Sequence, residues 1–194
     1  IEQGLSHEKF DALVRHEAPV ADLDVIALCH TNEYIDEIRA IAPTEGMIYL
    51  DGDTAMSPGT LEAALRATGG AVAAVDAVMT NPRTNAFVGT RPPGHHAESM
   101  RSMGFCFFDS AAIAARYAQR QYGAERVAVV DFDVHHGNGT QEIFWADRRV
   151  MYASTHQMPL FPGTGAIQER GDNDTIVNAP LHEGNGSREF REAF

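Results

Sequence analysis

Residues 131–140 combine acidic, imidazole and small side chains in one short stretch, Asp-Phe-Asp-Val-His-His-Gly-Asn-Gly-Thr. Side chains alternate along an extended chain, so Asp131, Asp133 and His135 are expected to project to one face. A catalytic zinc ion takes three protein ligands from His, Asp or Glu and leaves one position for water or substrate. The segment therefore predicts a divalent-metal site that needs a further ligand from elsewhere. The alternative is that the aspartates cap the following helix and the histidines pack or are solvated.

A second cluster, Arg-Pro-Pro-Gly-His-His-Ala-Glu, occupies residues 91–98. Its prolines fix φ and its glycine permits a tight approach, so His95 and His96 are expected on a stiff loop. Imidazoles suit proton transfer near neutral pH because their ordinary pKa lies close to it. Both rings can serve one site only if the loop bends, since adjacent side chains on an extended chain point apart. Taken alone, the cluster is equally consistent with an ordinary loop that carries two solvated histidines.

The elements that must position these clusters alternate between strand and helix. Such alternation predicts an α/β fold around a mainly parallel sheet, in which ligands bind at the carboxyl ends of the strands. The Gly69–Gly70 pair inside an expected helix predicts close packing or a bend. The expected elements are mostly helix over the first forty residues, strands at 47–50, 86–88, 127–133, 150–154 and 176–181, and helices over 31–40, from Ser57–Pro58 to Asn81–Pro82, from Asp109 or Ser110 to Tyr122, around 141–145 and from Ser187.

Composition excludes several classes of protein. The 194 residues are 44% hydrophobic and 22% charged, with only Cys29 and Cys106, which excludes intrinsic disorder and a disulfide scaffold. We therefore expect a single domain over residues 1–194. The formal net charge of −12 excludes non-specific binding to nucleic acid. No apolar run approaches the ~18 residues that span a bilayer, so no membrane partner is expected. Two unpaired cysteines indicate a reducing, cytoplasmic location.

Taken together and in order, the motifs of this sequence resemble the histone deacetylase superfamily, in its class II-like and bacterial deacetylase-like amidohydrolase branch. The resemblance covers nearly the whole chain. It implies a three-layer arginase/deacetylase-like α/β fold, with a mainly parallel sheet flanked by helices and the C-terminal part missing. The chain start, without an initiator methionine, is also expected to be truncated. The motifs are Asp51-Gly52-Asp53-Thr54, Arg91-Pro92-Pro93-Gly94-His95-His96-Ala97, Gly104-Phe105-Cys106, Asp131-Phe132-Asp133-Val134-His135-His136-Gly137-Asn138-Gly139-Thr140 and Phe161-Pro162-Gly163-Thr164-Gly165.

The resemblance implies two cation sites. Asp133 and His135 match two of the three zinc ligands of the family. A potassium ion is implied nearby, at Asp131, Asp133 and His135 together with Ser154 and the Thr155 carbonyl.

The resemblance also implies roles for the paired histidines. His96 matches the general base, and later acid, and His95 matches the partner that stabilises charge. Asp131 matches the carboxylate that orients His95. Asn138 faces the second histidine, where many relatives carry Asp. Because a neutral amide stabilises an imidazolium less than a carboxylate does, we expect a lower pKa for His96 than Asp would give.

Four further residues are implied to bind substrate. Phe105, which follows Gly104, and Phe161 match the two walls of a narrow tube around an acyl-lysine side chain. An apolar tube suits the methylene stem of lysine, since each buried CH₂ contributes about 0.8 kcal/mol. Asp53 matches the carboxylate that holds the substrate backbone at the rim of the tube, and Asp51 is the weaker candidate for that role.

The reaction implied by the resemblance is zinc-dependent hydrolysis of an amide, removing acetyl or other acyl groups from lysine side chains or similar amines. The partners would be an acetyl-lysine peptide or protein, or an acetylated polyamine if the chain is an acetylpolyamine amidohydrolase; an oligomer is left open. A catalytically inactive fragment or binding module is a further alternative. The family's third zinc ligand is an aspartate in a later Gly-Phe-Asp-Ala-His-like segment, and no such segment occurs before Phe194.

Overall fold

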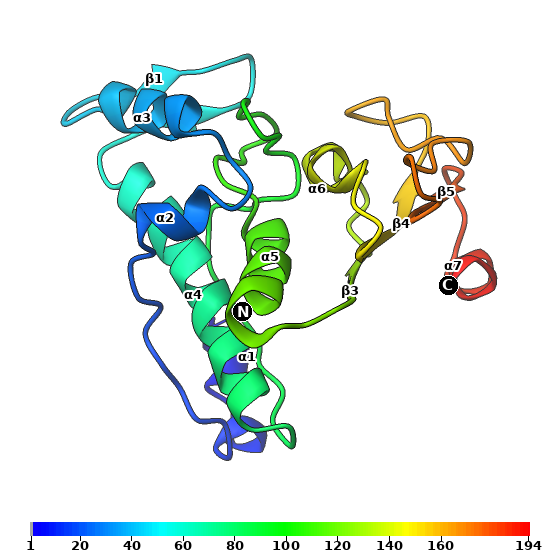
Figure 1. Cartoon of the computed structure of the whole chain (residues 1–194), viewed down its shortest axis with the longest axis horizontal. Helices are drawn as coiled ribbons and strands as arrows, with labels where there is room; N and C mark the ends of the chain where they lie inside the picture. Colours follow the sequence, from blue (N-terminus) through cyan, green and yellow to red (C-terminus); the bar gives the residue numbers. More distant parts are fainter. Residues whose placement is uncertain (1) are drawn as a thin grey trace.

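The computed structural model describes residues 2–194, with most helices gathered at one side of the molecule and a small parallel sheet at the other (Figure 1). The helices are α1 (Glu2–Leu5), the 3-10 turn η1 (Glu8–Phe10), α2 (Leu23–Ile26), α3 (Asn32–Ile41), α4 (Thr60–Thr80), α5 (Ser110–Tyr122), α6 (Asn138–Phe144) and α7 (Ser187–Ala193). The strands are β1 (Ile48–Tyr49), β2 (Ala55–Met56), β3 (Val127–Asp131), β4 (Val150–Gln157) and β5 (Ile176–Leu181).

The predicted α/β architecture and its parallel sheet are confirmed. Strands β3, β4 and β5 pair in that order and all run parallel, with α6 connecting β3 to β4. In this register Asp131 lies beside Ser154, and Ser154 lies beside Asn178. Polar side chains of three strands therefore meet towards the carboxyl ends, where α/β sheets bind their ligands.

Helix α4 confirms the expected close approach at the glycine pair. A Cβ atom on Gly69 would lie 1.9 Å from the carbonyl oxygen of Pro19, so only glycine lets the segment 18–21 cross the helix here. The helix begins at Thr60, after Gly59 with φ of +88°, and not at Ser57–Pro58 as predicted. The Thr60 hydroxyl accepts a hydrogen bond from the Ser57 amide, which places Ser57 in the turn before the helix.

Three expectations for local structure are wrong. Residues 47–50 form no buried strand: β1 pairs only with β2 in a short antiparallel ladder, and Tyr49 is 71% exposed. Residues 86–88 form no strand, and Phe87 is 72% exposed. Residues 11–22 contain no helix, so the first forty residues are not mostly helical. Short apolar runs predict strands poorly because pairing depends on a partner that the run itself does not specify.

The hydrophobic core lies between the helices. Ile26 of α2, Ile38 of α3 and Ile113 of α5 are all buried within one cluster that includes Phe108 and Phe144. Its small residues allow α4 and α5 to pack closely side by side (Figure 1). This cluster supports the loop before α5 and the start of α6.

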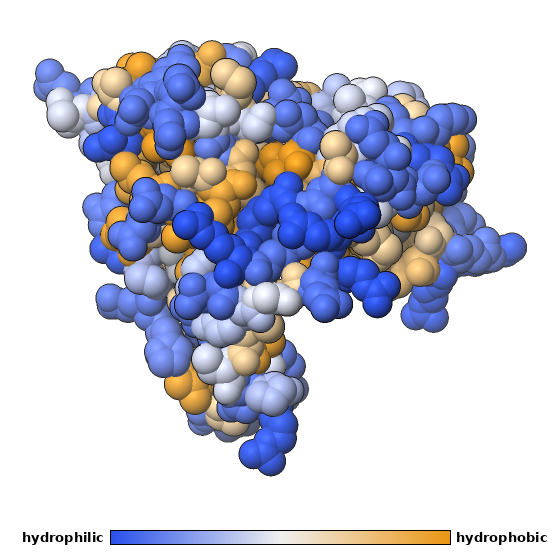
Figure 2. All heavy atoms as spheres, in the orientation of Figure 1, coloured by the Kyte–Doolittle hydropathy of each residue, from blue (hydrophilic) through white to orange (hydrophobic). Residues whose placement is uncertain are grey.

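One face of the sheet carries apolar side chains that reach solvent. Val130, Met151 and Val177 are 46%, 41% and 48% exposed, although parallel sheets are usually covered on both faces. Apolar residues also reach the surface in patches among hydrophilic ones on the face shown in Figure 2. Within residues 2–194, no helix combines the length and the apolar character needed to cross a membrane.

Asp109 joins α5 to α6 inside the core. One carboxylate oxygen accepts from the Ala112 amide at 2.9 Å and caps α5, and the other accepts from the Thr140 hydroxyl at 2.6 Å. The side chain is fully buried, and burial raises the pKa of Asp109 to about 6, although both hydrogen bonds act in the opposite direction.

We expect Asp109→Ala to lower the free energy of unfolding by about 2–4 kcal/mol, because α5 loses its cap and Thr140 loses its partner. Asp109→Asn is the matched control, since its amide oxygen still caps α5 and its amide nitrogen can donate to Thr140. Urea unfolding followed by circular dichroism measures both variants. A loss below about 1 kcal/mol in the alanine variant would contradict this account.

Asp109 also predicts a pH dependence of stability. The unfolded carboxyl has a pKa near ~3.9, whereas the folded one has a pKa of about 6, so the folded state binds this proton more tightly. The contribution of Asp109 to stability therefore falls as pH rises from about 4 to about 6, and is constant above that. Relative to wild type, Asp109→Asn should gain unfolding free energy across this window. A difference that is independent of pH would show that Asp109 does not titrate in this way.

Candidate functional site

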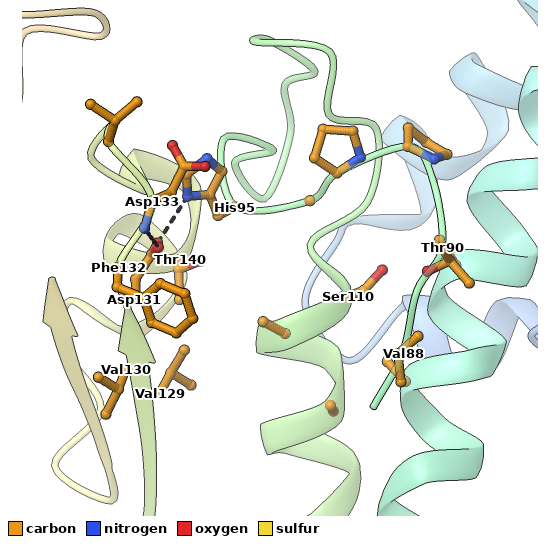
Figure 3. Close-up of a pocket in the computed structure, with 18 residues that line it drawn as sticks. Val88, Thr90, His95, Ser110, Val129, Val130, Asp131, Phe132, Asp133 and Thr140 are labelled. Carbon is orange, nitrogen blue, oxygen red and sulfur yellow. Dashed lines mark hydrogen bonds and ion pairs between the residues drawn. The ribbon is translucent and has the colours of Figure 1, made fainter. Parts of the chain in front are cut away.

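The segment after β3 folds into two successive turns that its own aspartates hold. Asp131 accepts from the Asp133 amide at 3.1 Å, and Asp133 accepts from the His135 amide at 2.8 Å. Figure 3 shows Asp131 and Asp133 at the end of β3, close to His95. The aspartates thus hold the backbone of these turns, whereas the alternative that they cap the following helix is not met, because α6 begins after Gly137 without a side-chain cap.

Asp133 and His135 are placed as a pair of metal donors would be. Their Oδ1 and Nδ1 atoms lie 3.3 Å apart, and both side chains are partly exposed. Two ligands on a tetrahedral zinc ion at ordinary bond lengths are separated by roughly 3.3–3.4 Å. Within residues 2–194, no group of three or more His, Cys, Asp or Glu side chains is arranged to hold a metal ion. The zinc site therefore stays a prediction, and Asp133 and His135 are the pair within residues 2–194 on which it depends.

His95 is held by a carboxylate. Its Nδ1 lies 2.8 Å from Asp131 Oδ2, which also accepts from the Tyr152 hydroxyl at 3.0 Å. Because an ionised carboxylate only accepts, the imidazole Nδ1 carries the proton. Burial alone would lower the pKa of His95, but the hydrogen bond and charge of Asp131 outweigh it and raise that pKa. The pKa of Asp131 is lowered by the same contact against the effect of burial, so the pair favours its charged form.

His96 is held by an amide. Its Nδ1 lies 2.8 Å from Asn138 Oδ1, and Asn138 Nδ2 donates to a carboxylate oxygen of Glu98 at 2.8 Å. Since Glu98 can only accept, the amide orientation follows, and His96 donates through Nδ1 and keeps a free lone pair on Nε2. Burial, and then the charge of His95, lower the pKa of His96 to about 4. The amide pulls this pKa upward, so burial contributes more to the low value than the choice of Asn does.

The two histidines and the two metal donors form one cluster. The rings of His95 and His96 have centroids 4.0 Å apart, and the His96 ring lies 6.0 Å from that of His135. The bend that the sequence required is therefore present. The arrangement brings together an imidazole with a raised pKa, an imidazole with a lowered pKa and the Asp133–His135 pair.

Phe161 lies against this cluster. Its ring meets the rings of His96 and His135 edge to face, with centroids 5.0 Å and 6.0 Å apart. The ring is 39% exposed, so it presents an apolar surface beside the histidines. The role of Phe161 as one wall of a tube stays a prediction.

Gly104, which precedes Phe105, lies against His96. A Cβ atom on Gly104 would lie 2.4 Å from His96 Cδ2, so the loop can approach the imidazole only with glycine at this position. Phe105 follows with φ of +67°, a left-handed conformation that is strained for a bulky residue, and its side chain is 59% exposed. Strain of this kind is typical of functional loops, and the role of Phe105 as a second wall stays a prediction.

Asp53 is linked to the Phe105 loop through Thr54. The Thr54 hydroxyl donates to Asp53 at 2.8 Å and accepts from the Phe105 amide at 3.2 Å. Asp51 instead accepts from the amides of Asp53 and Thr54 and so holds the turn. Of the two aspartates, Asp53 accepts fewer hydrogen bonds, and its role at the rim of the tube stays a prediction.

The residues predicted for potassium are brought near one another by the sheet register. Ser154 lies beside Asp131 on the neighbouring strand, and its hydroxyl is within 2.9 Å of His156 Nδ1. The Thr155 hydroxyl is buried and makes no hydrogen bond within residues 2–194. The potassium site stays a prediction, since it depends on backbone carbonyls and a bound ion.

A cavity of about 670 Å³ lies beside His95, between β3 and α5 (Figure 3). His95, Asp131 and Asp133 line one end of it, and small residues of α5 line the other side. Among the residues that line it, neither Phe105 nor Phe161 occurs, so this space is distinct from the predicted tube.

Sequence reasoning missed two residues that orient the site. Tyr152 donates to Asp131, and Glu98 fixes the amide of Asn138. Tyr152 and Ser154 alternate on one face of β4, which is the signal that could have found the tyrosine. No local pattern indicates the Glu98 contact, because it joins residues forty positions apart.

Comparison with known proteins gives consistent results. An uncharacterised protein of Synechocystis is 44% identical over 169 residues, covering 87% of this chain and 55% of its own length. A probable deacetylase of Archaeoglobus fulgidus is 43% identical over 174 residues, covering 88% of this chain and 47% of its own length. The histone deacetylase-like amidohydrolase of Pseudomonas aeruginosa is 38% identical over 185 residues, covering 93% and 48%.

The fold is also shared with a solved structure. The HD domain of HDA15 superimposes with a TM-score of 0.87 at 34% identity, over 93% of this chain and 52% of that one. The chain thus spans about half the length of the relatives it matches. The family described as the histone deacetylase domain matches residues 1–194. On this evidence, the chain belongs to the histone deacetylase domain family.

Proposed function

We propose that this chain carries the proton-transfer pair and part of the substrate tube of a zinc-dependent amide hydrolase that removes acetyl or other acyl groups from lysine side chains or similar amines. One observation carries the proposal. Two adjacent histidines receive opposite pKa shifts, downward at His96 and upward at His95, beside two metal donors. Opposite shifts within one cleft are typical of an acid–base pair.

His96 is suited to act as the base. It is neutral over the physiological pH range, and its free Nε2 lone pair can take a proton from the water that attacks the amide carbonyl. The Asn138 oxygen accepts from Nδ1–H and stabilises the positive charge that the ring then gains. The same nitrogen can return that proton to the leaving amine.

His95 has the complementary role. The Asp131 carboxylate raises the pKa of His95, so this ring takes up a proton more readily than His96, and in its protonated form it places a positive charge where negative charge develops on the carbonyl oxygen. A protonated imidazole cannot take a proton from water, which separates the roles of the two rings.

The metal and the substrate complete the proposal. When bound at Asp133 and His135 with a third ligand, a zinc ion supplies a Lewis acid for the amide carbonyl. Phe105 and Phe161 provide apolar surface for the methylene stem of the substrate, and Asp53 provides an acceptor for its backbone amide. The implied potassium ion would neutralise part of the charge on Asp131. Cys29 and Cys106 are buried free thiols, which supports the reducing, cytoplasmic location inferred above.

We expect His96→Ala to lower deacetylation of a fluorogenic acetyl-lysine peptide by about 10²–10⁴-fold, in a protein that contains this chain together with the third metal ligand. His182→Ala is the matched control, because His182 lies exposed in the turn before α7. Activity in His96→Ala within about tenfold of wild type would contradict the proposal. Faster turnover of acetylspermidine than of the peptide would assign the substrate to polyamines.

We expect the isolated chain to bind zinc weakly through Asp133 and His135, because two protein ligands are fewer than the three of a catalytic site. Competition against a chromophoric zinc chelator measures the affinity. Asp133→Ala and His135→Ala should each weaken it by about tenfold or more, and Asp174→Ala, on an exposed turn, should not change it. Stoichiometric zinc retained through gel filtration would show instead that the site is complete in this chain.

A further inference from the structure

We propose that Glu169 is a positioning residue that holds the loop 158–171 so that Phe161 lies against the histidine pair. The inference deepens the proposed function, because it assigns the residues that place one wall of the substrate tube. Glu169 touches neither histidine nor either metal donor, so its effect acts through the loop.

The Glu169 carboxylate forms hydrogen bonds with the backbone of the loop and with α6. It accepts from the backbone amides of Gly165 at 2.9 Å and Ala166 at 3.1 Å. It also accepts from the side-chain amide of Gln141, in α6, at 2.7 Å. Three donors on one carboxylate satisfy most of its acceptor capacity, so Glu169 is not available as the missing metal ligand.

Gln141 extends this contact back to the same loop. Its amide nitrogen is used by Glu169, so its oxygen must be the acceptor from Asn178 Nδ2 at 2.7 Å and from His136 Nε2 at 3.0 Å. With Nε2 as the donor, the neutral ring of His136 accepts through Nδ1 from the Thr164 hydroxyl at 2.8 Å. A chain of hydrogen bonds through Gln141 and His136 thus connects Glu169 with Thr164 of the same loop.

The turn that these bonds hold is tightly packed. Gly165 is buried with φ of +94°, and a Cβ atom there would lie 2.4 Å from His156 Nε2 and 2.6 Å from His136 Cγ. The carbonyl oxygen of Gly165 accepts from His156 Nε2 at 2.9 Å. The middle of the loop is therefore fixed to α6 and β4 by side chains and not by a strand ladder.

The ends of the loop are held separately. The Met158 amide donates to the Leu181 carbonyl at 2.8 Å, and the Asp172 amide donates to the Trp145 carbonyl at 2.9 Å. Phe161 lies between these ends, three residues before Thr164. The hydrogen bonds that link Glu169 to Thr164 are therefore the contacts nearest to Phe161 on its C-terminal side along the loop. Removing Glu169 should therefore release the centre of the loop while its ends stay in place.

The experiment follows the ring of Phe161 in the free chain by fluorine NMR, after labelling with 4-fluorophenylalanine. The Phe161 resonance is assigned from Phe161→Leu, and its exposure is measured as broadening by a nitroxide probe in solution. The ring is 39% exposed, so we expect Glu169→Ala to increase this broadening about twofold as the ring enters solvent. The resonances of buried rings such as Phe144 should not change.

Two comparisons separate positioning from general stability. Glu183→Ala, on an exposed turn, is the matched control and should leave the Phe161 resonance unchanged. Glu169→Gln keeps the shape of the side chain and one acceptor oxygen, so it should restore part of the wild-type signal. Emission of Trp145, the only tryptophan, should not change, because it reports the end of the loop held through Asp172.

An unchanged Phe161 resonance in folded Glu169→Ala would overturn the proposal, even if the variant unfolds at a lower temperature. Should Glu169→Ala fail to fold, Glu169→Gln decides the question in the same way: broadening equal to wild type overturns it. The measurement contains neither metal nor substrate. A negative result here therefore leaves the proposed hydrolase function to the separate test on His96→Ala.

Discussion

Two imidazole rings with centroids 4.0 Å apart cannot both carry a positive charge at low cost, and the site depends on how the fold separates their charges. A carboxylate faces His95 and an amide faces His96. Both partners come from one short stretch, the end of β3 and the first residue of α6. The chemical difference between the rings is therefore set by the strand–turn–helix that follows β3.

In that turn the backbone lies very close to neighbouring side chains and to the histidine loop, which explains its glycines. A Cβ atom on Gly137 would lie 2.6 Å from Asp131 Oδ2 and 3.0 Å from His95 Nδ1. One on Gly139 would lie 2.2 Å from the carbonyl oxygen of Ala97, and its amide donates to the His95 carbonyl at 2.9 Å. Small residues at these positions let α6 approach the loop that carries the histidines.

Buried polar contacts extend outward from this junction in two directions. Towards the helices, Asp109 holds Thr140 of α6 and caps α5. Towards the sheet, Gln141 of α6 holds Glu169 and Asn178. These contacts tie α6 to the core on one side and to the sheet and the loop 158–171 on the other. The positions of Phe161 and of the histidine pair therefore depend on the position of α6.

The sequence by itself determined the elements with strong local signals. The strand at 176–181, the helix capped by Asp109 and ended by Gly123, and the close packing at the Gly69–Gly70 pair follow from periodicity, capping and small size, which are properties of neighbouring residues. The metal donors and histidines could be predicted for the same reason, since their types and spacing are local. That the segment 18–21 is what crosses at Gly69 was decided by the tertiary structure. The short, exposed pairing of β1 in place of a buried strand at 47–50, and the absence of a strand at 86–88, were decided by tertiary structure, because a strand needs a partner. So were the fixed amide of Asn138, the opposite pKa shifts and the Glu169 contacts. Each joins residues far apart in the chain, and only folding sets their distance, burial and charge.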